Sequence, residues 1–117
     1  MSKRIFTLRE AMDLLPRVRE ITREAVACTE EIAAQLQNTS DSRARRPLEE
    51  EYNAAVQDWA ENILELGVEV KGLWLVDFDS GDGIYYCWSH PEPTIEFFHD
   101  YGAGFAGRRP LGKLGLS

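Results

Sequence analysis

The chain has 117 residues with 13 basic and 20 acidic side chains, a net charge of −7 and a pI near 4.8. This length predicts one domain, residues 1–117, and the acidic charge disfavours nucleic-acid partners because it repels phosphate backbones. No apolar run reaches the roughly 18 residues that a membrane span needs, so we expect a cytoplasmic protein without a membrane partner.

The two cysteines, Cys28 and Cys87, are too few and too far apart for a disulfide scaffold. The basic segment 1–6 is followed by no apolar signal core, which agrees with a cytoplasmic location. We therefore expect both cysteines to be free thiols.

The first predicted element is a long helix that starts after Thr7. Thr7 and Glu10 have the spacing of a capping box, in which each side chain accepts a hydrogen bond from the other residue's backbone amide. Pro16 removes one backbone donor, so we expect a kink there or a short helix followed by a new start. Three rows recur at seven-residue spacing and form an apolar stripe: Leu8, Leu15, Thr22, Thr29 and Leu36; Ala11, Val18, Ala25 and Ile32; Leu14, Ile21 and Cys28.

A second helix is predicted after the turn-forming segment 38–42. Pro47 suits its first turn, and the acidic residues 49–51 follow where the helix dipole favours negative charge. Gly67 is typical of the end of a helix. Residues 7–66 are therefore predicted to form a long antiparallel helical hairpin. The apolar face of the second helix consists of Leu48, Tyr52, Ala55, Trp59, Ile63 and Leu66.

Residues 68–100 have the pattern of short strands joined by turns. Aromatic and β-branched runs are separated there by Gly, Asp and Pro residues, which predicts a small antiparallel β-meander of three or four strands. Residues 101–117 form a Gly-rich C-terminal tail that we expect to be irregular. The expected fold class is α+β, with the helices segregated from the sheet.

Four side chains near the last two strands are candidates for a polar site. If these strands pair, Cys87, His90, Glu92 and His99 converge, and a thiol, two imidazoles and a carboxylate are ligands for zinc. The same groups could supply a Cys–His nucleophile. The alternative is structural, because tight ligand spacing is absent and a single cysteine in an aromatic strand is more often a small buried hydrophobe.

The segment 102–107 matches the G-x-G-x-x-G pattern of dinucleotide-binding folds. Such a fold also needs a following helix and a parallel strand, and only ten residues follow Gly107, so we expect no nucleotide cofactor. Amides at Gly104 and Gly107, beside Arg108 and Arg109, could still bind a small anion. The alternative is a flexible tail with solvated arginines.

Sequence blocks in a fixed order cover nearly the whole chain: FTLREA at 6–11, LLP at 14–16, LGVEVK at 66–71, LVDF at 75–78, CW at 87–88, EP at 92–93, and His99 followed by GFAGR at 104–108. In these blocks the chain resembles the domain of unknown function 2203 family, a group of small uncharacterised bacterial proteins. The resemblance implies no activity.

The resemblance does indicate where a site would lie. The polar positions of the family correspond here to Asp77, Glu92, His99 and Arg108, and with Cys87 and Trp88 they form the candidate polar cluster. Two residues depart from the family pattern, because Pro91 replaces a usual glycine and Phe98 replaces a frequent tryptophan. Neither change removes a polar group, although Pro91 alters the turn.

The sequence identifies no biochemical activity and leaves open whether the protein is an enzyme. The leading hypothesis is a non-enzymatic, homo-oligomeric structural or interaction module. A homodimer through the helices is expected because an apolar stripe remains after the hairpin packs. The alternative is a small-anion or metal-binding site, with or without catalysis, around Cys87, Glu92, His99 and Arg108. We also expect Asp77, Glu92, His99 and Arg108 to form a hydrogen-bonded cluster that pins the tail to the sheet.

Overall fold

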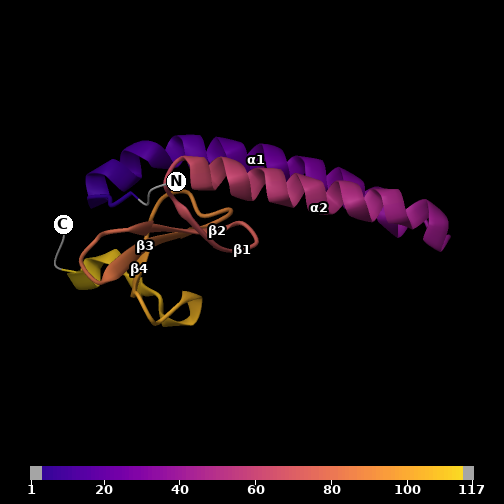
Figure 1. Ribbon diagram of the computed structural model, residues 1–117. Coiled ribbons are helices and arrows are strands. Elements are labelled where there is room, and N and C mark those ends of the chain that lie inside the picture. The colour runs from indigo at the N-terminus through magenta and orange to yellow at the C-terminus, as the bar shows by residue number, and fades with distance from the viewer. Residues whose placement is uncertain (1–3, 115–117) are drawn as a thin grey trace.

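The computed structural model describes residues 4–114 as two layers, a helical hairpin over a β-sheet (Figure 1). The α+β class, with a helical hairpin followed by an antiparallel meander, is therefore confirmed. The elements in chain order are α1 Leu8–Gln37, α2 Ser42–Glu65, β1 Glu69–Gly72, β2 Leu75–Asp79, β3 Ile84–Ser89, β4 Phe97–Asp100, the 3-10 helix η1 Phe105–Gly107, β5 Arg109–Pro110, and the 3-10 helix η2 Leu111–Leu114.

Helix α1 begins where the sequence predicts. The Thr7 hydroxyl accepts a hydrogen bond from the Glu10 N–H, and the Glu10 carboxylate accepts one from the Thr7 N–H, which confirms the capping box. Pro16 lies inside a single helix of 30 residues, so the alternative of two separate helices is wrong. The proline is exposed, and packing of the apolar rows on both sides of it holds the helix together.

Helix α2 begins at Ser42, so the prediction that Pro47 lies in its first turn is wrong. The Asp41 carboxylate accepts a hydrogen bond from the Ala44 N–H and caps the helix, so Pro47 lies within it. The acidic residues 49–51 consequently lie beyond the first turn, where the helix dipole no longer favours them.

The two helices are joined tightly at the tip of the hairpin. Arg45 Nη1 donates to the carbonyl oxygens of Leu36 and Thr39, at 2.7 and 2.9 Å, and so ties the start of α2 to the end of α1. At the other end of α2, Gly67 has a φ of 84°, a left-handed conformation that suits glycine and confirms the predicted stop.

The strands form one antiparallel sheet in the order β1-β2-β3-β4-β5. The first four belong to the predicted meander, whereas β5 lies in the tail that the sequence predicts to be irregular and pairs with β4. A strand of two residues that includes a proline has too little alternation to be recognised from sequence. Residues 115–117 of the predicted tail, like residues 1–3, lie outside the described residues.

Alternation along the strands creates one apolar face, which packs against the helices. Within this core the Trp59 indole N–H donates to the Thr22 hydroxyl at 2.9 Å and links the two helices. The buried core includes Val76, Phe78, Tyr86 and Trp88 from the sheet and Ala11, Leu15, Val18, Trp59 and Ile63 from the helices.

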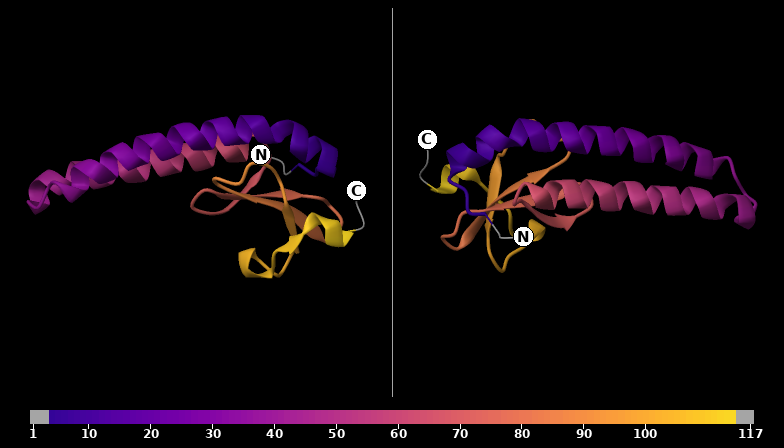
Figure 2. Two further views of the ribbon diagram at one scale, coloured as in Figure 1. Left: turned by 180° about the vertical axis from the view of Figure 1, so that it is seen from behind. Right: turned by 45° about the horizontal axis from the view of Figure 1, so that its top comes forward.

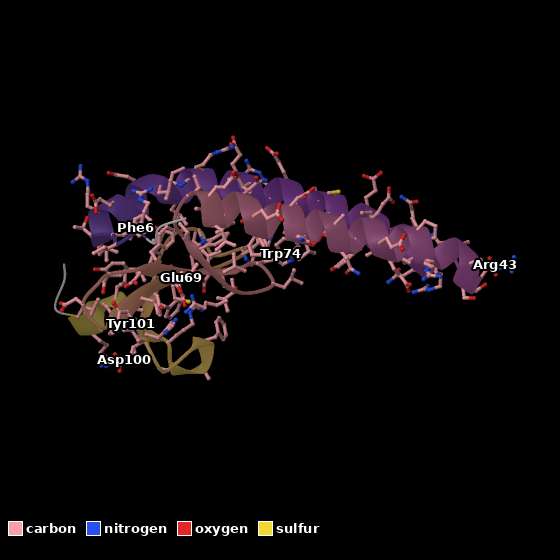
Figure 3. All side chains as sticks on the ribbon, viewed as in Figure 1. Phe6, Arg43, Glu69, Trp74, Asp100 and Tyr101 are labelled. Carbon is pink, nitrogen blue, oxygen red and sulfur yellow. The ribbon has the colours of Figure 1, made fainter. Side chains whose placement is uncertain are left out.

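The hairpin is longer than the sheet that supports it. The molecule measures 54 × 27 × 25 Å, and the views in Figure 2 show the sheet beneath one end of the hairpin while the other end projects beyond it. Trp74, in the turn between β1 and β2, packs edge-to-face on Trp59 with ring centroids 4.9 Å apart, near where the hairpin leaves the sheet (Figure 3). No helix within residues 4–114 is long and apolar enough to cross a membrane.

Replacing Thr22 by valine is expected to lower the free energy of unfolding by about 1–3 kcal/mol, because the buried Trp59 N–H loses its acceptor. Chemical denaturation followed by tryptophan fluorescence measures the change. Ser42→Ala, at the exposed start of α2, is the control and should alter stability by less than about 0.5 kcal/mol. Equal stability of Thr22→Val and the wild type would contradict the role given to this hydrogen bond.

Candidate functional site

The sheet face that points away from the helices carries polar and ionisable side chains, and the tail lies on the same side (Figure 1). Residues two apart on a strand share a face, and the register places Asp77 opposite Cys87 and Tyr85 opposite His99. We call this group the polar layer: Glu69, Lys71, Asp77, Tyr85, Cys87 and His99 from the strands, with Glu92 and Arg108 from the segments that flank β4.

Asp77 and His99 form the centre of the polar layer. Their side chains are 1% and 3% exposed, and His99 Nε2 lies 2.9 Å from Asp77 Oδ2. His99 Nδ1 lies 2.8 Å from the carbonyl oxygen of Asp100, which can only accept a hydrogen bond, so Nδ1 carries a proton. These two contacts fix the imidazole ring with Nε2 directed at Asp77.

Cys87 lies directly across from Asp77 and is fully buried. Its Sγ, an Asp77 carboxylate oxygen and a His99 ring nitrogen all lie within 4.8 Å of one another. Burial raises the pKa of the thiol to about 12, Asp77 adds to the increase, and Arg108 opposes it. The thiol is therefore protonated near neutral pH and is a poor nucleophile in this state.

Lys71 closes one side of the polar layer. Its Nζ lies 3.5 Å from Asp77 Oδ2 and 3.4 Å from Glu69 Oε1, and it sits over the Tyr85 ring at 3.9 Å from the centroid. Burial lowers the pKa of Lys71, but Asp77, Tyr85 and Glu69 together outweigh this effect, so the pKa is raised. The ammonium group therefore stays charged and balances the carboxylates around it.

Lys71, Glu69 and Tyr85 are absent from the candidates that the sequence suggests. The alternating segment 68–71 contains a usable signal, because alternation places residues 69 and 71 on one face of a strand. Which neighbours that face would meet depends on the pairing register, which no local pattern supplies.

Arg108 closes the opposite side of the layer. Its Nη2 donates to Glu92 Oε1 at 2.6 Å and lies 3.5 Å from the Cys87 carbonyl oxygen. The guanidinium group also lies over the rings of Phe97 and Phe105, with centroid distances of 4.2 and 4.7 Å. The Arg108 side chain is only 11% exposed, so this ion pair is shielded from solvent.

The structure thus arranges the predicted polar residues as two ion pairs with Cys87 between them. Asp77 contacts His99, Glu92 contacts Arg108, and within residues 4–114 no hydrogen bond joins one pair directly to the other. Trp88 instead lies in the core, although its indole N–H donates to the Glu92 carbonyl oxygen at 2.8 Å.

The ligand set that the structure assembles differs from the zinc set suggested by sequence. His90 and Glu92 line a small recess beneath α1 with Arg19 and Arg23, and neither belongs to the group around Cys87. Asp77 takes their place, because strand pairing puts it opposite the thiol.

The arginines of the glycine-rich segment have carboxylate partners. Arg108 is held by Glu92, and Arg109 Nη2 donates to Asp100 Oδ1 at 3.0 Å. The Gly107 N–H donates to the Gly104 carbonyl oxygen at 3.1 Å, which closes the turn of η1. A small anion at Gly104, Gly107, Arg108 and Arg109 would have to compete with these interactions, and its binding stays a prediction.

The family model described as "Uncharacterized conserved protein (DUF2203)" matches residues 4–111. No curated protein and no solved structure matched the chain.

Both cysteines are free in the structure, with Cys28 exposed and Cys87 buried. We expect a thiol reagent to label one cysteine quickly in the native protein and two after unfolding without reductant. Cys28→Ser should remove the fast reaction. Finding no thiol in an unfolded, unreduced chain that still runs as a monomer on a denaturing gel would contradict the assignment.

Arg108→Ala is expected to lower the free energy of unfolding by about 1.5–3 kcal/mol and to speed proteolysis of the tail, because it removes a shielded, charge-assisted hydrogen bond. Thermal melts and limited proteolysis measure the two effects. Arg109→Ala is the matched control, since its ion pair is exposed and contributes about 1 kcal/mol at most. An Arg108→Ala variant that melts and is cleaved like the wild type would show that this pair does not pin the tail.

Proposed function

The chain belongs to the domain of unknown function 2203 family, whose description names no activity, and we propose that it is a non-enzymatic interaction module that pairs through its helical hairpin. The proposal depends mainly on one observation: a partly apolar groove is lined by residues of both helices of the hairpin, two of which, Ile21 and Ala25, also pack against the core. Two copies joined at this groove would form an antiparallel four-helix bundle.

The position of the groove follows from helical geometry. Arg19 lines a recess with Trp88 of β3 and Glu92 of the loop that follows it, so this side of α1 faces the sheet. Ile21, two positions further along, points to roughly the opposite side. The groove there is lined by Ile21, Ala25, Cys28, Ala55 and Trp59, together with the polar residues Arg17, Glu24, Asp58 and Asn62.

The groove has a continuation toward the hairpin tip. Leu36 follows Ile21, Ala25 and Cys28 on one face of α1, because the intervals between them are multiples or sums of three and four residues. It lines a second recess with Tyr52 of α2. The apolar strip therefore extends along the part of the hairpin that projects past the sheet.

Charge favours an antiparallel arrangement of the two copies. The hairpin tip is basic, with exposed Arg43 and Arg46, and Figure 3 shows Arg43 at the far end from the sheet. The opposite end of α2 is acidic, with exposed Glu61 and Glu65. A two-fold axis across the hairpin places the basic tip of one copy beside the acidic end of the other. Cys28 lies midway between Ile21 and Leu36 along α1. In this arrangement it would lie near Cys28 of the second copy.

Two further observations favour a binding role inside the cytoplasm. The ionic groups of the polar layer are paired with one another, and its buried thiol has a pKa of about 12, so this layer, within the described residues 4–114, holds no activated thiol nucleophile. Two free cysteines in one chain suit a reducing compartment.

Light scattering after size exclusion tests the proposal. We expect a species of twice the 13.3 kDa chain mass, and a single species at 13.3 kDa up to high concentration would overturn the dimer. Ile21→Asp should split or unfold the dimer, because it places a charge in the groove. Glu50→Ala, an exposed residue outside the groove, should leave it intact.

Two further measurements do not depend on the folding of the Ile21→Asp variant. The double variant Arg43→Glu, Arg46→Glu changes only exposed tip residues and should weaken the dimer at low salt. Mild oxidation should cross-link the wild type through Cys28 and should not cross-link Cys28→Ser. A dimer that is indifferent to both changes would refute this antiparallel interface.

A further inference from the structure

We propose that the polar layer binds one Zn²⁺ ion through Asp77, Cys87 and His99. These residues offer a carboxylate oxygen, a thiolate sulfur and an imidazole nitrogen, which are the three types of protein ligand that zinc uses. The site lies on the sheet face opposite the helices, so it does not depend on the dimer proposed above.

The three donors are positioned by the sheet and not by a mobile loop. Asp77, Cys87 and His99 lie on the neighbouring strands β2, β3 and β4, and all three point to the same face. Their donor atoms lie within 4.8 Å of one another. Ligand atoms of a tetrahedral zinc ion are about 3.3–3.7 Å apart, given metal–ligand bonds of about 2.0–2.3 Å. Only small side-chain rotations are therefore needed.

His99 is oriented as metal-binding histidines usually are. Its Nδ1–H donates to the Asp100 carbonyl oxygen at 2.8 Å, and this bond leaves Nε2 as the atom that faces Asp77 and the thiol. A backbone acceptor on the outer nitrogen fixes the ring and its tautomer in many metal sites. The arrangement thus includes part of the outer support that a metal site requires.

The Asp77 carboxylate has coordinating capacity that the surrounding protein does not use. Its Oδ1 is buried and has no partner at hydrogen-bond distance within residues 4–114, although the neighbouring Cys87 thiol interacts with the carboxylate. Unpaired buried polar atoms are uncommon because they lose their hydration without compensation. The other oxygen, Oδ2, lies 2.9 Å from His99 Nε2. Two atoms that can both act as acceptors are close together here, and either a proton or a metal cation can bridge them.

The charges of the layer also suit a dication. The Asp77 carboxylate and the Cys87 thiolate would match the charge of Zn²⁺, with the thiol proton released to solvent. Two cations flank the site, but Lys71 is paired with Glu69 at 3.4 Å and Arg108 with Glu92 at 2.6 Å. Lys71 nevertheless contacts Asp77 Oδ2 at 3.5 Å and competes for that oxygen.

The donor chemistry selects the class of metal. A thiolate with an imidazole favours zinc and related transition metals, whereas Ca²⁺ and Mg²⁺ require mainly oxygen ligands. Three protein ligands leave one tetrahedral position for a water molecule.

The test uses the full chain purified without an affinity tag, since a histidine tag would bind zinc itself. After loading with zinc salt and desalting, elemental analysis should find one zinc per wild-type chain and per Cys28→Ser chain. Competition with a chelating dye should show that Asp77→Asn, Cys87→Ser and His99→Gln each bind zinc at least about tenfold more weakly. Glu50→Gln, an exposed residue of α2 outside the polar layer, should bind normally.

Two further measurements guard against variants that fail to fold. Cobalt bound to the wild type should show a thiolate-to-metal charge-transfer band, and Cys28→Ser should retain it. Lys71→Met should bind zinc several-fold more tightly, because a competing cation is removed. A wild type that retains no zinc, a cobalt spectrum without the thiolate band, or normal binding by a folded Cys87→Ser or Asp77→Asn variant would overturn the proposal.

Discussion

Burial of the Asp77 carboxylate is the constraint on which the outer side of the sheet depends. A buried charge is costly unless a partner compensates it, and Asp77 is 1% exposed. Lys71 on the adjacent strand β1 and His99 on β4, beyond β3, meet its Oδ2 at 3.5 and 2.9 Å. Each partner then brings its own requirements: His99 needs the Asp100 carbonyl, and Lys71 is balanced by Glu69. One buried carboxylate thus organises three strands.

The second ion pair has a different role, because it joins the tail to the sheet. The helices cover only one face of the sheet, so the other must be covered by its own side chains and by the chain that follows β4 (Figure 1). Arg108 does this by reaching Glu92 while its guanidinium group lies over Phe97 and Phe105. The β5 pairing keeps Arg108 in reach, and the thiol of Cys87 is buried beneath this cover. The conformation of the tail and the burial of the candidate site are therefore coupled.

The parts of the fold that depend on local periodicity could be predicted, and those that depend on register or competing signals could not. The Thr7–Glu10 cap and the hairpin follow from short-range patterns. At the start of α2 two local signals compete, and the Asp41 cap prevails over Pro47. The candidate residues could be chosen through family resemblance. The contacts among them could not be predicted, because the contact between Lys71 and Asp77 exists only once β1 and β2 pair. Strand pairing also explains why Asp77, and not the predicted His90, lies beside Cys87.

A site built in this way differs physically from a zinc finger, in which the metal organises an otherwise unfolded chain. Here the apolar core on the other face of the sheet does not involve Asp77, Cys87 or His99, and in the metal-free layer His99 already contacts one oxygen of the Asp77 carboxylate. The apolar core therefore stabilises the fold without a metal. A bound ion would add stability by mass action, as any ligand of the native state does. The donors are already close together before the metal arrives, so little ordering opposes binding. What opposes it is the cost of releasing the Cys87 proton, because the thiol has a pKa of about 12, and of replacing the existing contact between His99 and Asp77. The affinity of the site is thus a balance between the metal–ligand bonds and two costs, deprotonation of a buried thiol and loss of the existing partner of a buried carboxylate.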